Sequence, residues 1–215
     1  MIQQNINRIK EELGETTLIA VSKFRSLAEL EALYGTGQRI FAENRVQELL
    51  SKQSELPSDI EWHLIGHLQT NKVKQIIEHV ALIHSVDSLK VLKEIQKQSN
   101  KKDITTNVLL QVHVAEEDSK YGFKPEELTH IAETGGLSDY PNVEFKGIMS
   151  MATLTQDAAQ IENEFARTVK TFNQIKAHVP NHESFTEISM GMSGDYLIAK
   201  KMGATMVRIG SKIFE

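Results

Sequence analysis

The sequence has 215 residues, of which 40% are hydrophobic and 25% charged, and this length and composition fit one globular domain of α/β-barrel size. A formal net charge of −5 argues against a nucleic-acid partner, because binding to phosphate backbones depends on clustered lysine and arginine. The absence of cysteine excludes disulfides, thiolate metal sites and a cysteine nucleophile, and it fits a reducing cell interior.

The N-terminal residues alternate polar and apolar side chains after Met1. They contain neither a signal peptide nor an apolar run long enough to span a bilayer, so we expect a cytoplasmic protein with no membrane partner. The same alternation has helical spacing and predicts an amphipathic helix over Ile2–Leu13.

Short β-rich runs then alternate with longer segments whose apolar residues recur at helical spacing. The expected strands cover residues 18–23, 39–43, 62–66, 83–86, 108–114, 145–149, 184–189 and 206–214. The crossover helices that parallel strands require are expected in the intervening segments, such as residues 27–34, 46–56, 89–99 and 158–177. This alternation predicts an α/β fold consisting of a single (β/α)8 TIM-type barrel, with residues 1–215 as one domain.

An open, doubly wound sheet is the alternative arrangement of such strands. Its usual glycine-rich turn after the first strand is missing here, because Lys23 is followed by Phe24, Arg25 and Ser26. The closed barrel is therefore favoured. Because the sequence ends almost directly after the eighth expected strand, we expect the usual last helix to be absent and the N-terminal helix to cover that side.

The segments after the seventh and eighth strands have the features of an anion site, and barrels often bind phosphate at these two loops. The first loop, residues 189–195, contains two glycines and Ser193, which is expected to cap the following helix. The second places Arg208 on the same strand face as Gly210, with Ser211 next. Each residue alone is explained as well by a cap, a turn or a strand-end charge, and only their convergence favours an anion site.

A lysine ends the first expected strand and would lie at the same mouth of the barrel, beside Arg208. By itself, Lys23 is more simply explained as a strand-end lysine whose ammonium group reaches solvent. A second cation nearby disfavours the charged form of a partly desolvated amine, which frees it to form a Schiff base with an aldehyde. Lys23 is therefore a candidate for covalent binding of an aldehyde.

These loops, together with further motifs at the strand ends, resemble the family of small pyridoxal-phosphate-binding proteins involved in cofactor homeostasis, which are built like the barrel domain of alanine racemase. The resemblance covers essentially the whole chain. The segments that carry it are residues 20–23, 41–44, 46–48, 62–66, 68–72, 118–122, 189–193 and 206–211. The sequence departs from the family at Ala42, where glycine is frequent, and at Glu215, after which most members continue with a short tail.

The resemblance implies a binding site for pyridoxal 5′-phosphate (PLP). The residues implied are Lys23, Asn44, Met192, Ser193, Arg208, Gly210 and Ser211. In that assignment, Lys23 holds PLP as a Schiff base and Ser193, Gly210 and Ser211 hold its phosphate. Arg208 would face the pyridine nitrogen, where a permanent positive charge disfavours protonation of the ring and weakens the cofactor as an electron sink.

The resemblance implies a role in intracellular PLP homeostasis with little or no catalysis and no catalytic residue. Racemases of this fold use a second base, a tyrosine on a separate C-terminal domain, which this sequence lacks, and without that dimerising domain we expect a monomer. Tyr121 and Tyr196 could reach the barrel mouth. Lys120 could accept or relay the aldehyde, but an ordinary surface lysine is the simpler explanation of it. A PLP-dependent amino-acid racemase and a Schiff-base aldolase acting on a sugar phosphate remain alternatives, and PLP-dependent apoenzymes are possible partners.

Histidines are the remaining candidates for metal ligands. His63 and His67 are four residues apart, a spacing that suits metal binding on a helix, but here they straddle the end of an expected strand. His79 and His84 have no acidic cluster near them in the sequence. We therefore expect no metal, and we interpret His63 and His67 as pocket-lining or structural residues.

Overall fold

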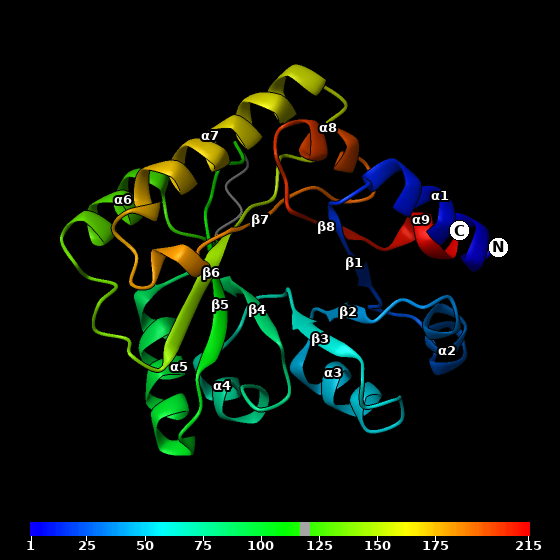
Figure 1. The fold of residues 1–215 in the computed structure, drawn as a ribbon, viewed down its shortest axis with the longest axis horizontal. Coiled ribbons are helices and arrows are strands. Elements are labelled where there is room, and N and C mark those ends of the chain that lie inside the picture. Colours follow the sequence, from blue (N-terminus) through cyan, green and yellow to red (C-terminus); the bar gives the residue numbers. More distant parts are fainter. Residues whose placement is uncertain (117–120) are drawn as a thin grey trace.

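Eight parallel strands close into a barrel in the order β1-β2-β3-β4-β5-β6-β7-β8, as the sequence predicts (Figure 1). The structure is a computed structural model that describes residues 1–116 and 121–215. The strands are β1 (Thr17–Val21), β2 (Ile40–Glu43), β3 (Glu61–Leu64), β4 (Leu82–Val86), β5 (Thr106–Gln111), β6 (Val143–Met149), β7 (Glu187–Ser189) and β8 (Met206–Ile209). The barrel closes where β8 pairs with β1, with Ile19 opposite Arg208.

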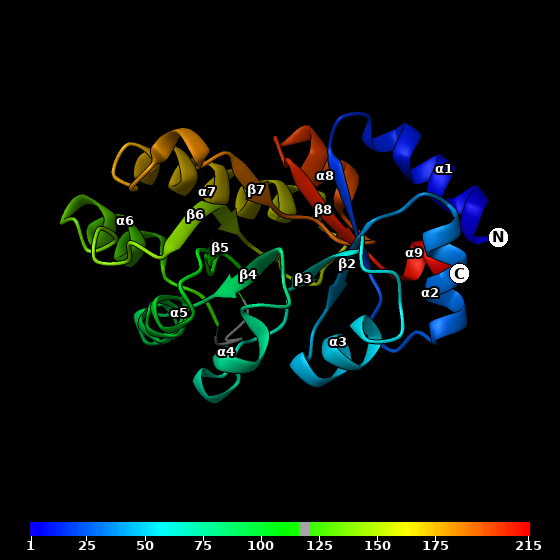
Figure 2. The same cartoon turned by 60° about the horizontal axis from the view of Figure 1, so that its bottom comes forward.

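Helices surround the strands (Figures 1 and 2). They are α1 (Ile2–Leu13), α2 (Leu27–Gly35), α3 (Val46–Gln53), α4 (Thr70–Ile76), α5 (Leu89–Lys102), α6 (Pro125–Glu133), α7 (Ala158–Lys176), α8 (Tyr196–Lys201) and α9 (Ser211–Phe214), with a 3₁₀ turn at His182–Ser184. The closed barrel rather than the open sheet is confirmed. No helix within residues 1–116 and 121–215 is long and apolar enough to cross a membrane.

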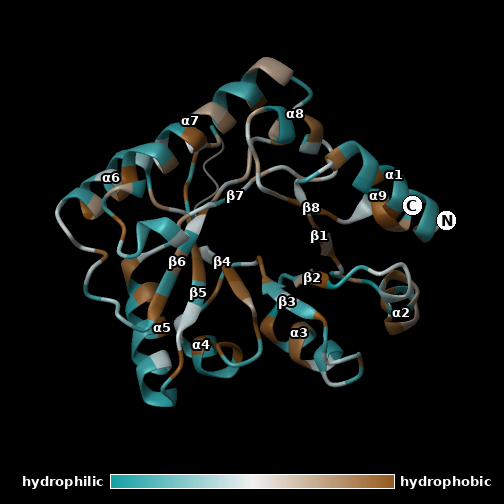
Figure 3. Ribbon diagram, viewed as in Figure 1, coloured by the Kyte–Doolittle hydropathy of each residue, from teal (hydrophilic) through white to brown (hydrophobic). Residues whose placement is uncertain are grey.

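The longer helices α1, α5 and α7 each bury apolar residues along one face. In α1, Ile6, Ile9 and Leu13 recur at helical spacing and are buried. Both faces of a barrel strand are covered, so every residue of β4 is buried. Figure 3 shows the result, with hydrophobic residues along β4 and hydrophilic residues on the outward faces of α1 and α5. Packing against the strands, rather than intrinsic helix propensity, thus holds the helices in place.

Local signals in the sequence set several helix ends. Ser26 and Glu29 form a reciprocal capping box at the start of α2, and the side chain of Ser88 accepts a hydrogen bond from the amide of Val91 at the start of α5. Asp157 accepts hydrogen bonds from two amides of the first turn of α7. These caps explain why each of the three helices begins within a residue of its expected position.

Several expected strands are wrong at their ends, including the fifth, which was expected over residues 108–114 and covers Thr106–Gln111. The strand expected over residues 184–189 begins only at Glu187, because Ser184 belongs to a 3₁₀ turn that Asn181 opens with a left-handed φ of 53°. The strand expected over residues 206–214 ends at Ile209, and after Gly210 the chain forms the helical turn α9.

The α9 turn also corrects the expectation that a last helix is absent. Although short, it packs on α1, close to the N-terminus (Figure 2). The side-chain amide of Asn5 donates to the carbonyl of Ile213 over 3.1 Å, and the guanidinium of Arg25 lies 4.7 Å from the centre of the Phe214 ring. The N-terminal helix therefore does cover this side of the barrel, as expected, but it does so by packing on α9.

Candidate functional site

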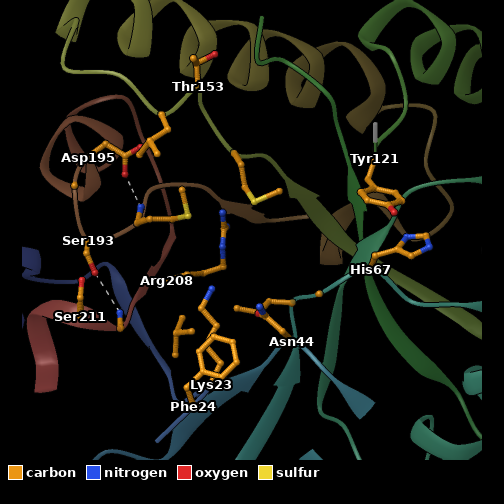
Figure 4. A pocket seen from close by; sticks show the side chains of 18 of the residues that line it. Lys23, Phe24, Asn44, His67, Tyr121, Thr153, Ser193, Asp195, Arg208 and Ser211 are labelled. Atoms are coloured by element: carbon orange, nitrogen blue, oxygen red, sulfur yellow. Dashed lines mark hydrogen bonds between the residues drawn. The ribbon is translucent and has the colours of Figure 1, made fainter. Parts of the chain in front are cut away.

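A cavity of about 920 Å³ opens at the carboxyl ends of the strands. All the residues that the sequence marks for cofactor binding line it (Figure 4), namely Lys23, Asn44, Met192, Ser193, Arg208, Gly210 and Ser211. They come from four separate parts of the chain, which follow β1, β2 and β7 or belong to the end of β8. Closure of the barrel between β8 and β1 is what brings the first and last of them together.

Lys23 lies in the loop two residues beyond the end of β1, not in the strand as expected. Its side chain points into the cavity toward Arg208 (Figure 4). The residue before it, Ser22, is completely buried. The residue after it, Phe24, has a φ of 64°, a left-handed conformation that bulky side chains rarely adopt. A sharply turned segment therefore presents the amine to the cavity.

Ser193 is not the helix cap that the sequence predicts, because the cap of α8 is Asp195, two residues later. The Oδ1 atom of Asp195 accepts the backbone amide of Met192 at 2.5 Å and closes the loop. The hydroxyl oxygen of Ser193 instead accepts the amide of Gly210 at 3.3 Å. This bond joins the loop after β7 to the loop after β8, so the two segments expected to hold an anion lie directly beside each other.

The guanidinium of Arg208 lies inside the barrel, and the residue is only 4% exposed. It donates to the hydroxyl of Ser189 at 2.6 Å and to the carbonyl of Ser150 at 2.8 Å, and both acceptors are uncharged. Burial lowers the pKa of Arg208 to about 10, while the nearby charge of Asp195 acts in the opposite direction, so the group stays charged at neutral pH. A positive charge held this way at the wall of a cavity favours an anionic ligand.

Two buried histidines extend this polar network across the barrel. The Nδ1 atom of His84 lies 3.0 Å from the hydroxyl of Ser189, and its Nε2 atom lies 2.9 Å from Nδ1 of His63. His63 is therefore structural, whereas His67 lines the cavity. Within residues 1–116 and 121–215, no group of three or more histidine, cysteine, aspartate or glutamate side chains is arranged to hold a metal ion.

We expect these two histidines to make the folded protein less stable in acid. Burial lowers the pKa of His63 to about 4 and that of His84 well below its usual 6.5. Below pH 6.5 these histidines therefore bind protons in the unfolded chain but not in the folded chain. Their contribution to the unfolding free energy is full above pH 6.5 and is lost as the pH falls toward 4. We expect a loss of roughly 1 kcal/mol per pH unit for each histidine.

Urea unfolding between pH 7.5 and 4.5 measures this loss. The variant His63→Gln should show a shallower dependence of unfolding free energy on pH than the wild type. The matched control His182→Gln changes an exposed histidine and should leave the dependence as it is. Equal slopes for wild type and His63→Gln would show that His63 does not stay neutral in the folded protein.

The tyrosines expected at the barrel mouth have different positions. Tyr121 lines the cavity and stacks on His67 with 4.1 Å between the ring centres, while His67 is held through Nδ1 by a 2.6 Å contact with Asp87. Tyr196 does not reach the mouth: it is buried and its hydroxyl donates to Glu12 of α1. Burial, followed by the bond to Glu12, raises the pKa of Tyr196 to about 12.

Part of the cavity wall was not predicted. The loop after β6 contributes Met151, Thr153, Leu154 and Thr155. The carboxylate of Glu164 in α7 accepts the amide of Thr153 at 2.7 Å and its hydroxyl at 2.7 Å, which anchors this loop. The sequence offered one signal for this loop, its position after a barrel strand, because the residues form no recognisable motif. Lys120, another candidate at the mouth, lies outside the described residues, as do residues 118 and 119 of the matching segment 118–122.

A close backbone contact shapes the wall near Asn44. A Cβ atom at Gly66 would lie 2.1 Å from the backbone oxygen of Asn44. We therefore expect Gly66→Ala to lower the unfolding free energy by about 3 kcal/mol, because the obstacle is backbone and cannot rotate away. The matched control Gly35→Ala, with nothing within 4 Å of the added atom, should be neutral or slightly stabilising. Urea unfolding of both variants tests this, and equal stability would contradict the contact.

Comparison with known proteins shows which family the chain belongs to. A family model described as alanine racemase, N-terminal domain, matches residues 1–215. A curated relative from Haemophilus influenzae, named pyridoxal phosphate homeostasis protein, is 34% identical over 99% of this chain and 94% of its own length. A relative of the same name from Helicobacter pylori is 39% identical over 92% of this chain and 86% of its own length. The chain belongs to the pyridoxal phosphate homeostasis protein family.

Solved structures show the same fold. The structure of PipY from Synechococcus elongatus without PLP has a TM-score of 0.93, with 34% identity and complete coverage of both chains. The structure of PipY with PLP bound has a TM-score of 0.89. Alanine racemase from Bartonella henselae shares the fold, with a TM-score of 0.77 at 19% identity, but this chain covers only 58% of that racemase. The family and fold inferred from the sequence are thus confirmed.

Proposed function

We propose that this chain binds PLP in the cavity at the barrel mouth and serves intracellular PLP homeostasis, with the Nζ atom of Lys23 as the point of attachment. The observation that carries the proposal is the convergence of three kinds of group in one cavity: the amine of Lys23, the buried charge of Arg208 and the joined loops that contain Ser193 and Gly210. PLP carries an aldehyde, which condenses with an amine to an imine with release of water.

The groups around the cavity fit the chemistry of the cofactor. Because Ser193 accepts the amide of Gly210, its own hydroxyl hydrogen is available for a phosphate oxygen. The side chain of Ser211, two residues after the end of β8, adds a second hydroxyl on the same side of the cavity (Figure 4). The positive charge of Arg208 adds attraction for the cofactor's negative charge. We assign the phosphate to this end of the cavity and the pyridine nitrogen to Arg208.

We further propose that the chain holds PLP reversibly for delivery to apoenzymes in the cytoplasm and that it acts as a monomer with little or no catalysis. The names of its relatives support a homeostasis role rather than an enzymatic one. The buried position of Tyr196, bonded to α1, also argues against its use as a second base. With Arg208 permanently charged near the ring, the cofactor would be a poor acceptor of electrons.

A titration of the purified protein with PLP tests the binding proposal. We expect a near-visible absorption band that saturates with added cofactor. A protein that stays colourless with excess PLP would contradict both a homeostasis role and a PLP enzyme, and it would favour a sugar-phosphate aldolase.

An amino-acid racemase is the second candidate, and the presence of Tyr121 in the wall of the cavity favours it. Racemisation of several amino acids, measured with saturating PLP, separates the two functions. We expect turnover far below about one per second, the low end for ordinary enzymes. Turnover at or above that rate, lost in Tyr121→Phe, would establish the racemase instead.

A further inference from the structure

A buried lysine lies next to the segment that carries Lys23, and the binding site as described does not use it. Lys52 of α3 is 7% exposed. Its Nζ atom donates to the carbonyl of Ser22 at 2.9 Å, to Oε1 of Glu43 at 2.7 Å and to Oε1 of Glu48 at 2.8 Å. An ammonium group has three hydrogens to donate, and these contacts use all of them. Lys52 therefore ties together the end of β1, the end of β2 and the start of α3.

Glu43 is the counter-charge at the centre of this group. It is completely buried, and its Oε1 atom also accepts the hydroxyl of Ser22 at 2.6 Å. Its other oxygen, Oε2, is the one buried side-chain polar atom without a hydrogen-bond partner within residues 1–116 and 121–215. Burial raises the pKa of Glu43 above its ordinary value, and the bonds from Lys52 and Ser22 offset only part of that rise. The contact with Lys52 thus reduces the cost of burying this carboxyl group.

These contacts hold the backbone on both sides of Lys23. On one side, the amide of Ser22 donates to the carbonyl of Ala42 at 3.0 Å, in addition to the bond from Lys52 to the Ser22 carbonyl. On the other side, the amide of Phe24 donates to Oε1 of Glu48 at 3.0 Å. Glu48 accepts from Lys52 as well, so one ammonium group connects the two ends of a three-residue segment.

The left-handed conformation of Phe24 requires hydrogen bonds of this kind to stabilise it. Its φ of 64° costs energy for a residue with a large side chain, and 76% of Phe24 is exposed, so packing does little to secure it. The amide of Phe24 donates to Glu48, and this bond opposes relaxation of the backbone at Phe24. Without it, the segment could relax to an ordinary conformation, and the amine of Lys23 would move relative to Ser193 and Arg208.

Stability alone does not explain the cluster. Taking charges out of water is costly, and apolar residues of similar size often stabilise a fold as well as a buried ion pair does. We propose that Lys52, Glu43 and Glu48 are positioning residues that fix the backbone around Lys23 and so set where its amine meets the ligand's aldehyde. This inference rests on the proposed binding of PLP at Lys23. Formation of the covalent bond depends steeply on geometry, and a displacement of about 1 Å can cost a factor of about 100 in rate.

The experiment compares PLP binding by the wild type and four variants. Lys52→Met removes the ammonium group and retains the length of the side chain. Glu48→Leu removes the acceptor of the Phe24 amide, whereas Glu48→Gln keeps an oxygen there and is the conservative match. Ser99→Ala is the control for a buried polar contact far from the cavity, because it breaks the 2.7 Å contact between Ser99 and Thr106.

Each protein is mixed with PLP at a temperature where circular dichroism shows it fully folded. Two quantities are measured: the rate at which the near-visible band appears and the PLP concentration that half-saturates it. We expect Lys52→Met to slow band formation by at least about tenfold and Glu48→Leu to slow it by a smaller factor. Glu48→Gln should recover most of the wild-type rate. Ser99→Ala should lower the melting temperature and leave the rate unchanged.

The outcomes separate this inference from the function on which it rests. A wild-type protein that forms no band would overturn the proposed PLP binding itself. If the wild type, Glu48→Leu and Glu48→Gln all form the band at the same rate, the positioning role alone is overturned. Glu48 lies in part at the surface, with 24% of its side chain exposed, so these two variants decide the question if Lys52→Met does not fold.

Discussion

Replacing Lys23 with alanine should abolish the near-visible absorption band of the protein mixed with PLP. The change removes the amine that points into the cavity, and no backbone group can form an imine in its place. Because Lys23 is exposed at the cavity, the variant should fold with the stability of the wild type. The spectrum with saturating PLP, together with a thermal unfolding curve, checks both statements.

A matched control separates loss of this amine from loss of any positive charge at the barrel mouth. Lys212 is exposed and directly follows Ser211, with its Nζ atom 4.8 Å from the centre of the Tyr196 ring. Lys212→Ala should keep the band at full intensity. A band of normal intensity in Lys23→Ala would mean that another lysine carries the aldehyde.

The second large effect is expected at the phosphate end of the cavity. Ser193→Asp would place a carboxylate where we assign the phosphate of PLP, and like charges at close range cost several kcal/mol. We expect the affinity for PLP to fall on the order of 100-fold, which corresponds to about 2.7 kcal/mol. Titration of the absorption band measures this loss.

Two comparisons give this prediction its specificity. Ser193→Ala removes one hydroxyl without adding charge, so its loss of affinity should be about tenfold, the size of one hydrogen bond. Pyridoxal, which has the same aldehyde but no phosphate, should bind Ser193→Asp as it binds the wild type. If both ligands weaken equally in Ser193→Asp, the phosphate does not lie at Ser193.

The barrel was predictable because its signal is repeated along the chain. Alternating strands and amphipathic helices leave few topologies, and a single misplaced boundary does not change the count of eight strands. The boundaries of β7 and β8 failed for a local reason. The residues Phe185 and Thr186 favour strands intrinsically, as do Ile213 and Phe214, but the turn at Asn181 and the break at Gly210 override that preference.

The cavity was predictable to the extent that its residues stand at strand ends. Lys23, Ser193 and Arg208 could be placed at one mouth because parallel strands of a barrel all end there. Hydrogen-bond partners were harder to infer: Ser193 precedes a helix and has the typical sequence of a cap, but Asp195 takes that position. The contact between Ser193 and Gly210 depends on how the loops after β7 and β8 lie beside each other in the fold.

The cluster around Lys52 could not be inferred from the sequence. Glu43 ends a strand and Lys52 follows nine residues later in a helix, so each has the appearance of an ordinary surface charge. Their contact depends on how α3 packs against the ends of β1 and β2, which no local pattern encodes. Burial of charged side chains results from tertiary packing, so sequence patterns predict it poorly.

Borohydride reduction of the protein with bound PLP, followed by peptide mapping, tests whether Lys23 carries the cofactor. Reduction converts the imine to a stable amine and marks the lysine that carried the cofactor. We expect the phosphopyridoxyl group to lie on Lys23 and the absorption band to disappear on reduction. A group on any other lysine, or no modified lysine at all, would contradict attachment at Lys23.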